Sequence, residues 1–284
     1  SKKMFNAHDI KVIDCPRDAI QGIKEYIPTH KKINHINTLI ASGLFEYIDF
    51  GSFVSPKAVP QMMDTAEVLG GLEKTNTTKL LAIIANVRGA ITAREYSQID
   101  YLGYPFSVSE TFQLRNANST IEESFESVKR IMDNIDHRKE LVVYISMAFG
   151  NPYDDIWNED LVLEWMQKLK GIGVKRFSIA DTTGEATPAS VHTLYSQIDK
   201  EFADLALSIH LHSRTDEALA KVNAAYDAGC RRFEGALMGY GGCPFAKDDL
   251  VGNIPTELLL QRFNLSTEQE IITLKQSFLQ LISK

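Results

Sequence analysis

The sequence predicts an α/β protein, a (β/α)8 TIM barrel in which residues 1–284 form one domain that ends in helices. Eight short β-rich runs recur along the chain, and segments with helical patterns lie between them. Parallel strands need long crossover connections, which helices usually supply, so this repeated alternation favours a closed parallel barrel. The competing architecture is an open doubly wound sheet, but no GxGxxG motif follows the first predicted strand.

The predicted strands are short runs rich in β-branched and other apolar residues, which is typical of buried parallel strands. They are 11–15 (KVIDC), 47–51 (YIDFG), 80–85 (LLAIIA), 98–106 (QIDYLGYPF), 141–147 (LVVYISM), 176–181 (RFSIAD), 206–212 (ALSIHLH) and 232–237 (RFEGAL).

One helix is predicted from its start in the segment STIEESFESVKRIM, which opens with a capping box. Ser119 or Thr120 can accept a hydrogen bond from the free N–H groups of the first turn. Glu122 or Glu123 can reach back to the backbone of the capping residue.

Three more helices have recognisable ends. In TPASVHTLYSQI, Thr187 is the expected N-cap and Pro188 occupies the first helical position, where its missing N–H costs nothing. The segment DEALAKVNAAYDAG stops at Gly229, because glycine readily adopts the left-handed conformation. The closing amphipathic helix is expected to begin with Ser266 and Gln269 as a second capping box.

Composition excludes several classes of protein. The chain is 44% hydrophobic and 24% charged, with a net charge of −7 and no basic run interleaved with aromatics, so we expect no nucleic-acid partner. No apolar stretch reaches the ~20 residues of a membrane helix, and the first residues show neither a secretory signal nor a transit pattern. The three cysteines (Cys15, Cys230, Cys243) form no CxxC pair. We therefore expect a cytoplasmic protein without a disulfide framework or a membrane partner.

The seventh strand carries two histidines, His210 and His212, with a single leucine between them. Side chains two residues apart on a strand project to the same side, so the two imidazoles should stand next to each other. Such a pair suggests a metal site, although one buried histidine alone is more often a packed core residue.

The chemistry of a barrel gathers where its strands end, and these positions carry further polar side chains. They are Arg17, Asp18 and Gln21 after the first strand, Asp49 in the second, Arg115 and Asn116 after the fourth, Asp181 after the sixth, and Cys243 and Asn253 after the eighth. One carboxylate, two imidazoles and one amide make a mixed nitrogen and oxygen site. Such a site suits Mg²⁺ or Mn²⁺, with Zn²⁺ also possible, and no thiolate cluster selects zinc.

Several motifs stand along the chain in the order PRDAIQ, SFVSPKAVPQM, NSTIEES, ADTTGEATP, HLH, GGCPFA and GN. In this order and spacing they resemble the 3-hydroxy-3-methylglutaryl-CoA (HMG-CoA) lyase family and the related metal-dependent barrel lyases and Claisen-type synthases. The resemblance runs nearly end to end. It implies a retro-Claisen cleavage of a 3-hydroxyacyl-CoA to acetyl-CoA and a keto acid, and a homodimer.

The resemblance also implies roles for individual residues. The metal ligands would be Asp18, His210, His212 and Asn253. The catalytic set expected is Arg17, Asp18, Asp49, Asp181, His210 and Cys243, in which Arg17 steadies the enolate oxygen and Cys243 takes part in proton transfer. We expect Gln21, Arg115 and Asn116 to bind the substrate.

The chain also departs from the family pattern. The family usually reads GPRDGLQNE in the first loop, so an asparagine and a glutamate are replaced by Gly22 and Ile23. Asp49 stands where glutamate is usual, and Ser213 follows the histidine pair in place of aspartate or asparagine. These changes leave three alternatives open: a different acyl group, a condensing synthase or aldolase, and a metal-binding barrel that has lost activity. Asp181 can equally serve only to tie down the sixth loop.

Overall fold

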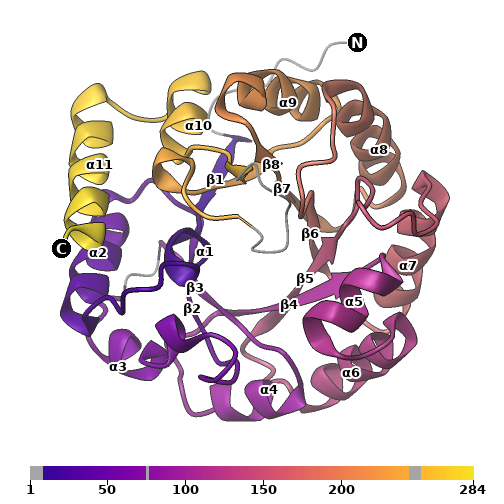
Figure 1. The fold of residues 1–284 in the computed structure, drawn as a ribbon, viewed down its shortest axis with the longest axis horizontal. Coiled ribbons are helices and arrows are strands. Elements are labelled where there is room, and N and C mark those ends of the chain that lie inside the picture. The colour runs from indigo at the N-terminus through magenta and orange to yellow at the C-terminus, as the bar shows by residue number, and fades with distance from the viewer. Residues whose placement is uncertain (1–8, 75–76, 243–250) are drawn as a thin grey trace.

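The computed structural model describes residues 9–74, 77–242 and 251–284. Eight parallel strands close into a barrel in the order β1-β2-β3-β4-β5-β6-β7-β9, and helices surround it (Figure 1). The barrel strands are β1 (Lys11–Asp14), β2 (Tyr47–Ser52), β3 (Lys79–Ile83), β4 (Tyr101–Ser107), β5 (Glu140–Ser146), β6 (Arg176–Ala180), β7 (Ala206–His210) and β9 (Arg232–Gly235). The predicted (β/α)8 TIM barrel is confirmed.

The described helices connect the strands in sequence order. They are α1 (Pro16–Gln21), α2 (Thr29–Ser42), α3 (Thr65–Gly70), α4 (Val87–Ala93), α5 (Glu110–Ala117), α6 (Ile121–Asn134), α7 (Glu159–Gly171), α8 (Pro188–Glu201), α9 (Thr215–Asp227), α10 (Thr256–Arg262) and α11 (Glu268–Ile282), with short 3-10 turns η2 (Pro60–Met62) and η3 (Leu237–Gly239). Residues 16–21, expected in a loop, form the short helix α1, which lies over the barrel mouth (Figure 1).

The helix starts follow local capping chemistry. In α6 the capping box uses Thr120 and Glu123, one of the predicted combinations. Helix α8 has Thr187 as its N-cap and Pro188 at its first position, as predicted.

Helix α9 stops where expected, since Gly229 takes a φ of +110° just beyond it. The capping box predicted for Ser266 and Gln269 is wrong. Thr267 and Glu270 form it one residue later, because both reciprocal hydrogen bonds are made there.

Two apolar layers stabilise the barrel. The larger lies between strands and helices, and a smaller one lies inside the barrel, where Ile13, Leu81 and Val142 belong to one buried cluster. Toward the strand ends the interior becomes polar, with Asp49, Ser178 and Glu234 almost fully buried. Side chains that carry charge are thus placed where water is excluded.

The seventh strand is shorter than predicted. β7 ends at His210, and His212 belongs to a separate two-residue strand, β8 (His212–Ser213). β8 pairs antiparallel with β10 (Gly252–Asn253), so that Asn253 lies opposite His212. This small ribbon brings together two residues that are far apart in the chain.

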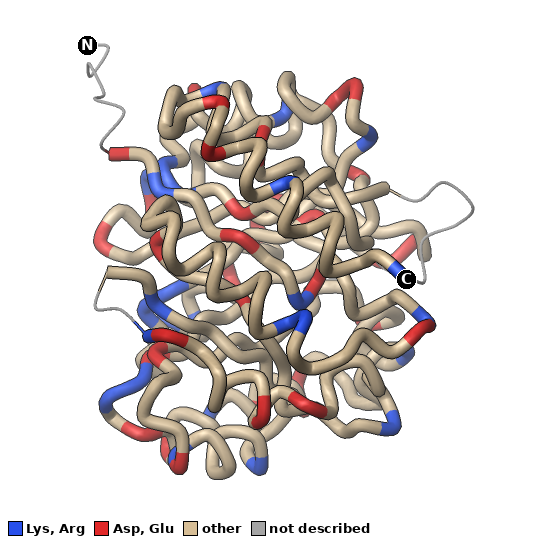
Figure 2. The backbone as a smooth tube through the Cα atoms, turned by 90° about the vertical axis from the view of Figure 1, so that its left-hand side faces the viewer, with Lys and Arg blue, Asp and Glu red and all other residues tan. Residues whose placement is uncertain are grey.

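Acidic and basic residues are interspersed over the described backbone (Figure 2). Among the described residues, no helix combines the length and the apolar character needed to span a bilayer.

Candidate metal centre and active site

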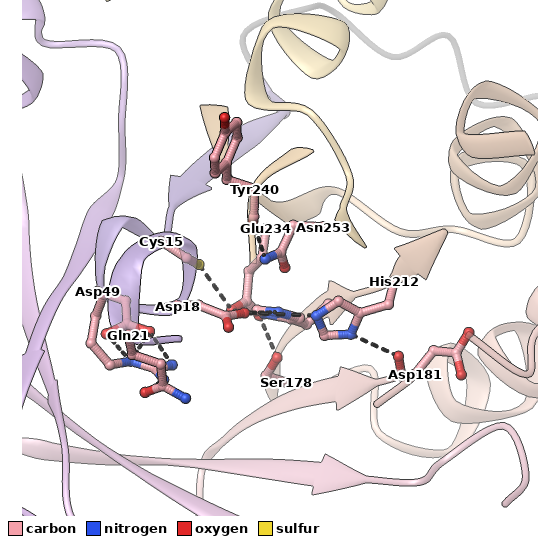
Figure 3. Close-up of polar contacts among 12 residues, drawn as sticks. Cys15, Asp18, Gln21, Asp49, Ser178, Asp181, His212, Glu234, Tyr240 and Asn253 are labelled. Atoms are coloured by element: carbon pink, nitrogen blue, oxygen red, sulfur yellow. Dashed lines mark hydrogen bonds and ion pairs between the residues drawn. The ribbon is translucent and has the colours of Figure 1, made fainter. Parts of the chain in front are cut away.

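Three side chains converge at the mouth of the barrel. Oδ2 of Asp18 lies 3.1 Å from Nε2 of His210 and 3.7 Å from Nε2 of His212. One ligand atom from each of the three residues lies within 4.8 Å of the others. The centroids of the two imidazole rings are 5.2 Å apart, so the histidine pair is adjacent as expected. Asp18 and His212 are labelled in Figure 3.

Asn253 approaches this group from the β8–β10 ribbon (Figure 3). Its amide nitrogen donates to the carbonyl of Tyr240 at 2.9 Å, which fixes the amide plane. Gly241 makes the close packing possible, because a Cβ there would lie 2.7 Å from both the Asn253 amide and the backbone oxygen of Asp18. Gly252 similarly packs so closely against the carbonyl oxygen of Gly239 that a Cβ would not fit there.

The imidazoles are oriented from behind. Nδ1 of His212 faces the carbonyl oxygen of Asp181 at 2.9 Å, and a carbonyl can only accept, so this nitrogen carries the proton. Nδ1 of His210 faces Oε1 of Glu234 at 3.0 Å and likewise donates. The unprotonated nitrogen of each ring, Nε2, therefore points toward Asp18, which is the arrangement that metal-binding histidines require.

Glu234 was not recognised from the sequence. It is almost fully buried on β9, and its carboxylate also accepts hydrogen bonds from Ser178 and, at 2.7 Å, from Ser208. The thiol of Cys15 lies 3.9 Å from the same carboxylate. The signal was a single glutamate inside an otherwise apolar strand, where a charge needs partners.

Arg17 forms a second charged unit beside the first. Its guanidinium contacts the carboxylate of Asp49 at 2.7, 3.1 and 3.2 Å, and its third nitrogen donates to Oε1 of Gln21 at 2.8 Å. Burial alone would lower the pKa of Arg17, but the charge of Asp49 and its hydrogen bonds raise it above the usual range. The group is a fixed cation whose charge acts on Asp18.

The charge balance fits a divalent cation. The site holds the carboxylates of Asp18, which is 12% exposed, and of the buried Asp49 and Glu234, against the single guanidinium of Arg17. Two negative charges therefore lack a fixed counter-ion when the imidazoles are neutral. Nε2 of His212 is buried and has no hydrogen-bond partner among the described residues, which a cation would supply. A carboxylate, two imidazole nitrogens and an amide oxygen suit such an ion.

A proton and a metal ion compete for the same side chains. Burial would raise the pKa of Asp18, but the hydrogen bond to His210, the nearby imidazole of His212 and the charge of Arg17 hold it well below its usual range. Burial would lower the pKa of His210, yet the charge of Glu234 and the hydrogen bond to Asp18 raise it well above normal. A metal bound at Nε2 of His210 would therefore displace a proton.

Tyr144 is a second residue missed from the sequence. Its buried hydroxyl has no hydrogen-bond partner within the described ranges, and its ring meets that of His210 edge-on with centroids 6.1 Å apart. An unpaired buried hydroxyl beside the cluster is available to a bound molecule.

The other expected residues lie elsewhere. The carboxylate of Asp181 points away from the cluster and accepts the backbone N–H groups of residues 185 and 186 at 2.8 and 2.9 Å (Figure 3). Arg115 and Asn116 are exposed on α5, where Arg115 stacks over the Tyr153 ring at 4.9 Å. Neither has a described hydrogen bond or ion pair with the cluster. Cys243 lies outside the described residues.

Comparisons with known proteins show the family to which the chain belongs. The family model described as HMGL-like matches residues 10–278. The cytoplasmic 3-hydroxy-3-methylglutaryl-CoA lyase of Rattus norvegicus is 34% identical over 259 residues, which cover 90% of this chain and 74% of that one. The 3-hydroxy-3-isohexenylglutaryl-CoA/hydroxy-methylglutaryl-CoA lyase of Pseudomonas aeruginosa is 33% identical over 88% of this chain and 82% of its own length.

A solved structure is similar over nearly the whole chain. It is an HMG-CoA lyase from Acinetobacter baumannii in complex with coenzyme A and 3-methylmalate, 32% identical, with a TM-score of 0.89. The alignment covers 98% of this chain and 93% of that one.

Proposed function

Because the chain belongs to the HMGL-like family, we propose that it is a divalent-metal-dependent carbon–carbon lyase. Its substrate is a 3-hydroxyacyl-CoA of the HMG-CoA type, which it cleaves to acetyl-CoA and a keto acid. One observation carries the proposal: Asp18, His210 and His212 converge beside the fixed cation of Arg17. Retro-Claisen cleavage needs a group that binds the substrate's C3 hydroxyl and a cation that stabilises the negative charge of the developing enolate.

The ion would be held by Asp18, His210, His212 and Asn253. When bound, a divalent cation such as Mg²⁺ or Mn²⁺ supplies a Lewis acid that lowers the pKa of a coordinated hydroxyl. We assign Asp18, a carboxylate that can hold the ion through one oxygen and accept a proton at the other, to take the proton from the C3 hydroxyl of the substrate, while His210 holds the ion beside it.

Loss of that proton lets the C3 oxygen form a carbonyl as the C2–C3 bond breaks, and the electron pair passes into a thioester enolate. Arg17, locked by Asp49 and Gln21, donates to the enolate oxygen. Because the guanidinium is already fixed, it needs no reorganisation as the charge develops. Cys243 then delivers a proton to C2, which completes acetyl-CoA. The hydroxyl of Tyr144 donates a hydrogen bond to a polar oxygen of the acyl group.

The acyl group need not be that of HMG-CoA. Ile23, in the position where the family has glutamate, packs against the hydrophobic core and offers no polar contact to a substrate. We assign the binding of the remaining substrate atoms to Gln21, Arg115 and Asn116, and we assign Asp181 the orientation of His212 through its carbonyl.

A substrate screen tests the proposal. The purified protein is stripped with chelator and assayed with Mg²⁺, Mn²⁺ or Zn²⁺ against HMG-CoA and 3-hydroxyacyl-CoAs with other branches, with acetyl-CoA as the readout. Cleavage that requires metal and is lost in Arg17→Met supports the lyase. Condensation of acetyl-CoA with keto acids but no cleavage would instead identify a synthase, and no turnover with any substrate would leave a metal-binding barrel.

We further propose that the protein is a cytoplasmic homodimer. The cytoplasmic relative from Rattus norvegicus supports the location. Light scattering on the purified chain tests the dimer, and cell fractionation tests the location.

A further inference from the structure

We propose that Glu234 is a positioning residue that prepares His210 to bind the metal. Its carboxylate holds Nδ1 of His210 from behind at 3.0 Å, on the side opposite Asp18. The inference rests on the proposed metal site and extends it to a residue that the sequence motifs did not include.

The contacts of Glu234 explain why it can fix the ring. Oε1 takes the His210 N–H, while Oε2 accepts the hydroxyls of Ser178 and Ser208. These partners come from the neighbouring strands β6 and β7, and Cys15 approaches from the end of β1. The carboxylate is therefore anchored from several strands, and it cannot follow His210 if the ring rotates.

The anchoring has a chemical consequence. As long as Nδ1 donates to Glu234, the lone pair that remains for a metal is on Nε2, which points to Asp18. Without an acceptor behind it, the ring can rotate or carry its proton on either nitrogen. Partners that orient metal-binding histidines in this way typically change metal affinity by about 10–100-fold when removed.

Three variants separate positioning from packing. Glu234→Met has nearly the same volume but no acceptor. Glu234→Gln loses the charge, yet its amide oxygen can still accept the His210 N–H. Ser208→Ala is the matched control, because it removes one neighbour of the same carboxylate and leaves the His210 contact in place.

Calorimetric titration with Mn²⁺ alone measures the affinity of each metal-stripped protein. We expect a loss of about 10–100-fold for Glu234→Met, a smaller loss for Glu234→Gln, and a change of less than about 3-fold for Ser208→Ala. Spectra of isotopically labelled histidine rings, assigned with His210→Gln, should show a protected Nδ1–H of His210 in the wild type and in Glu234→Gln. That signal should disappear in Glu234→Met.

The outcomes that overturn the inference are specific. If the wild-type spectrum shows no protected Nδ1–H for His210, the inference is refuted, and this holds even if Glu234→Met fails to fold. Equal Mn²⁺ affinity in Glu234→Met and wild type refutes the role of Glu234 and leaves the metal site intact. If the wild type binds no Mn²⁺, both the metal site and this inference fail.

Discussion

Asp49→Asn should destabilise the protein through the charge that it leaves behind. The side chain of Asp49 is fully buried and that of Arg17 is only 12% exposed. The substitution hardly changes volume, but it replaces the carboxylate that contacts the guanidinium at 2.7 to 3.2 Å by a neutral amide. Removing one partner of a buried pair typically costs about 3–5 kcal/mol, because the remaining charge is uncompensated.

We expect the lower part of that range, since Arg17 keeps some contact with water and Gln21 still accepts one of its N–H groups. Arg17→Met removes the stranded charge. The loss of unfolding free energy in the double variant Asp49→Asn/Arg17→Met should therefore be about 2 kcal/mol smaller than the sum of the losses in the two single variants. Turnover in Asp49→Asn should fall by about 100-fold or more, as when a donor to a developing oxyanion is lost.

Urea unfolding, followed by the fluorescence of Trp157 and Trp165, measures the free energies of the single and double variants. Effects that add within about 0.5 kcal/mol would refute the reasoning. Asp64→Asn is the matched control, since it breaks the equally buried Lys32–Asp64 pair outside the metal cluster. It should lose stability without a change in Mn²⁺ affinity.

Three further predictions concern the metal, the proton donor and the pH dependence. His210→Ala should lose most bound metal, and undiminished metal by elemental analysis would contradict the assignment. Cys243→Ser should turn over more slowly with unchanged metal binding, and an unchanged rate would remove Cys243 from the mechanism. Burial raises the pKa of Asp14 from 3.8 to about 7, opposed by its hydrogen bond to Thr256. Since the folded protein then keeps a proton that the unfolded chain loses, the contribution of Asp14 to the unfolding free energy should fall by about 4 kcal/mol between pH 4 and 7 and stay level above. Asp14→Asn should remove this decline in urea titrations at each pH, and an identical decline in the variant would refute the assignment.

Local patterns predicted the barrel well, because strand composition and helix capping act over a few residues. The eight runs and the helix starts at Thr120 and Thr187 follow from such signals. The break in the seventh strand could not be predicted, because it depends on pairing between β8 and β10, about 40 residues apart.

The site was predicted unevenly for similar reasons. Asp18 and the histidine pair lie at strand ends, where the barrel fold itself indicates chemistry. Glu234 and Tyr144 lie within strands, and only the closed barrel shows that their polar atoms face the cluster. Asp181 is the opposite case: its position at a strand end suggested catalysis, but it equally allowed a role in tying down the sixth loop, and its carboxylate accepts two backbone N–H groups of that loop.

The contact between Gly239 and Gly252 has an evolutionary consequence. A Cβ on Gly252 would collide with the carbonyl oxygen of Gly239, and one on Gly241 would collide with the Asn253 amide and the backbone oxygen of Asp18. A larger residue at Gly241 or Gly252 would therefore displace Asn253 and one wall of the ion site together. Both positions should stay glycine in relatives that keep the ion, whatever acyl group they bind.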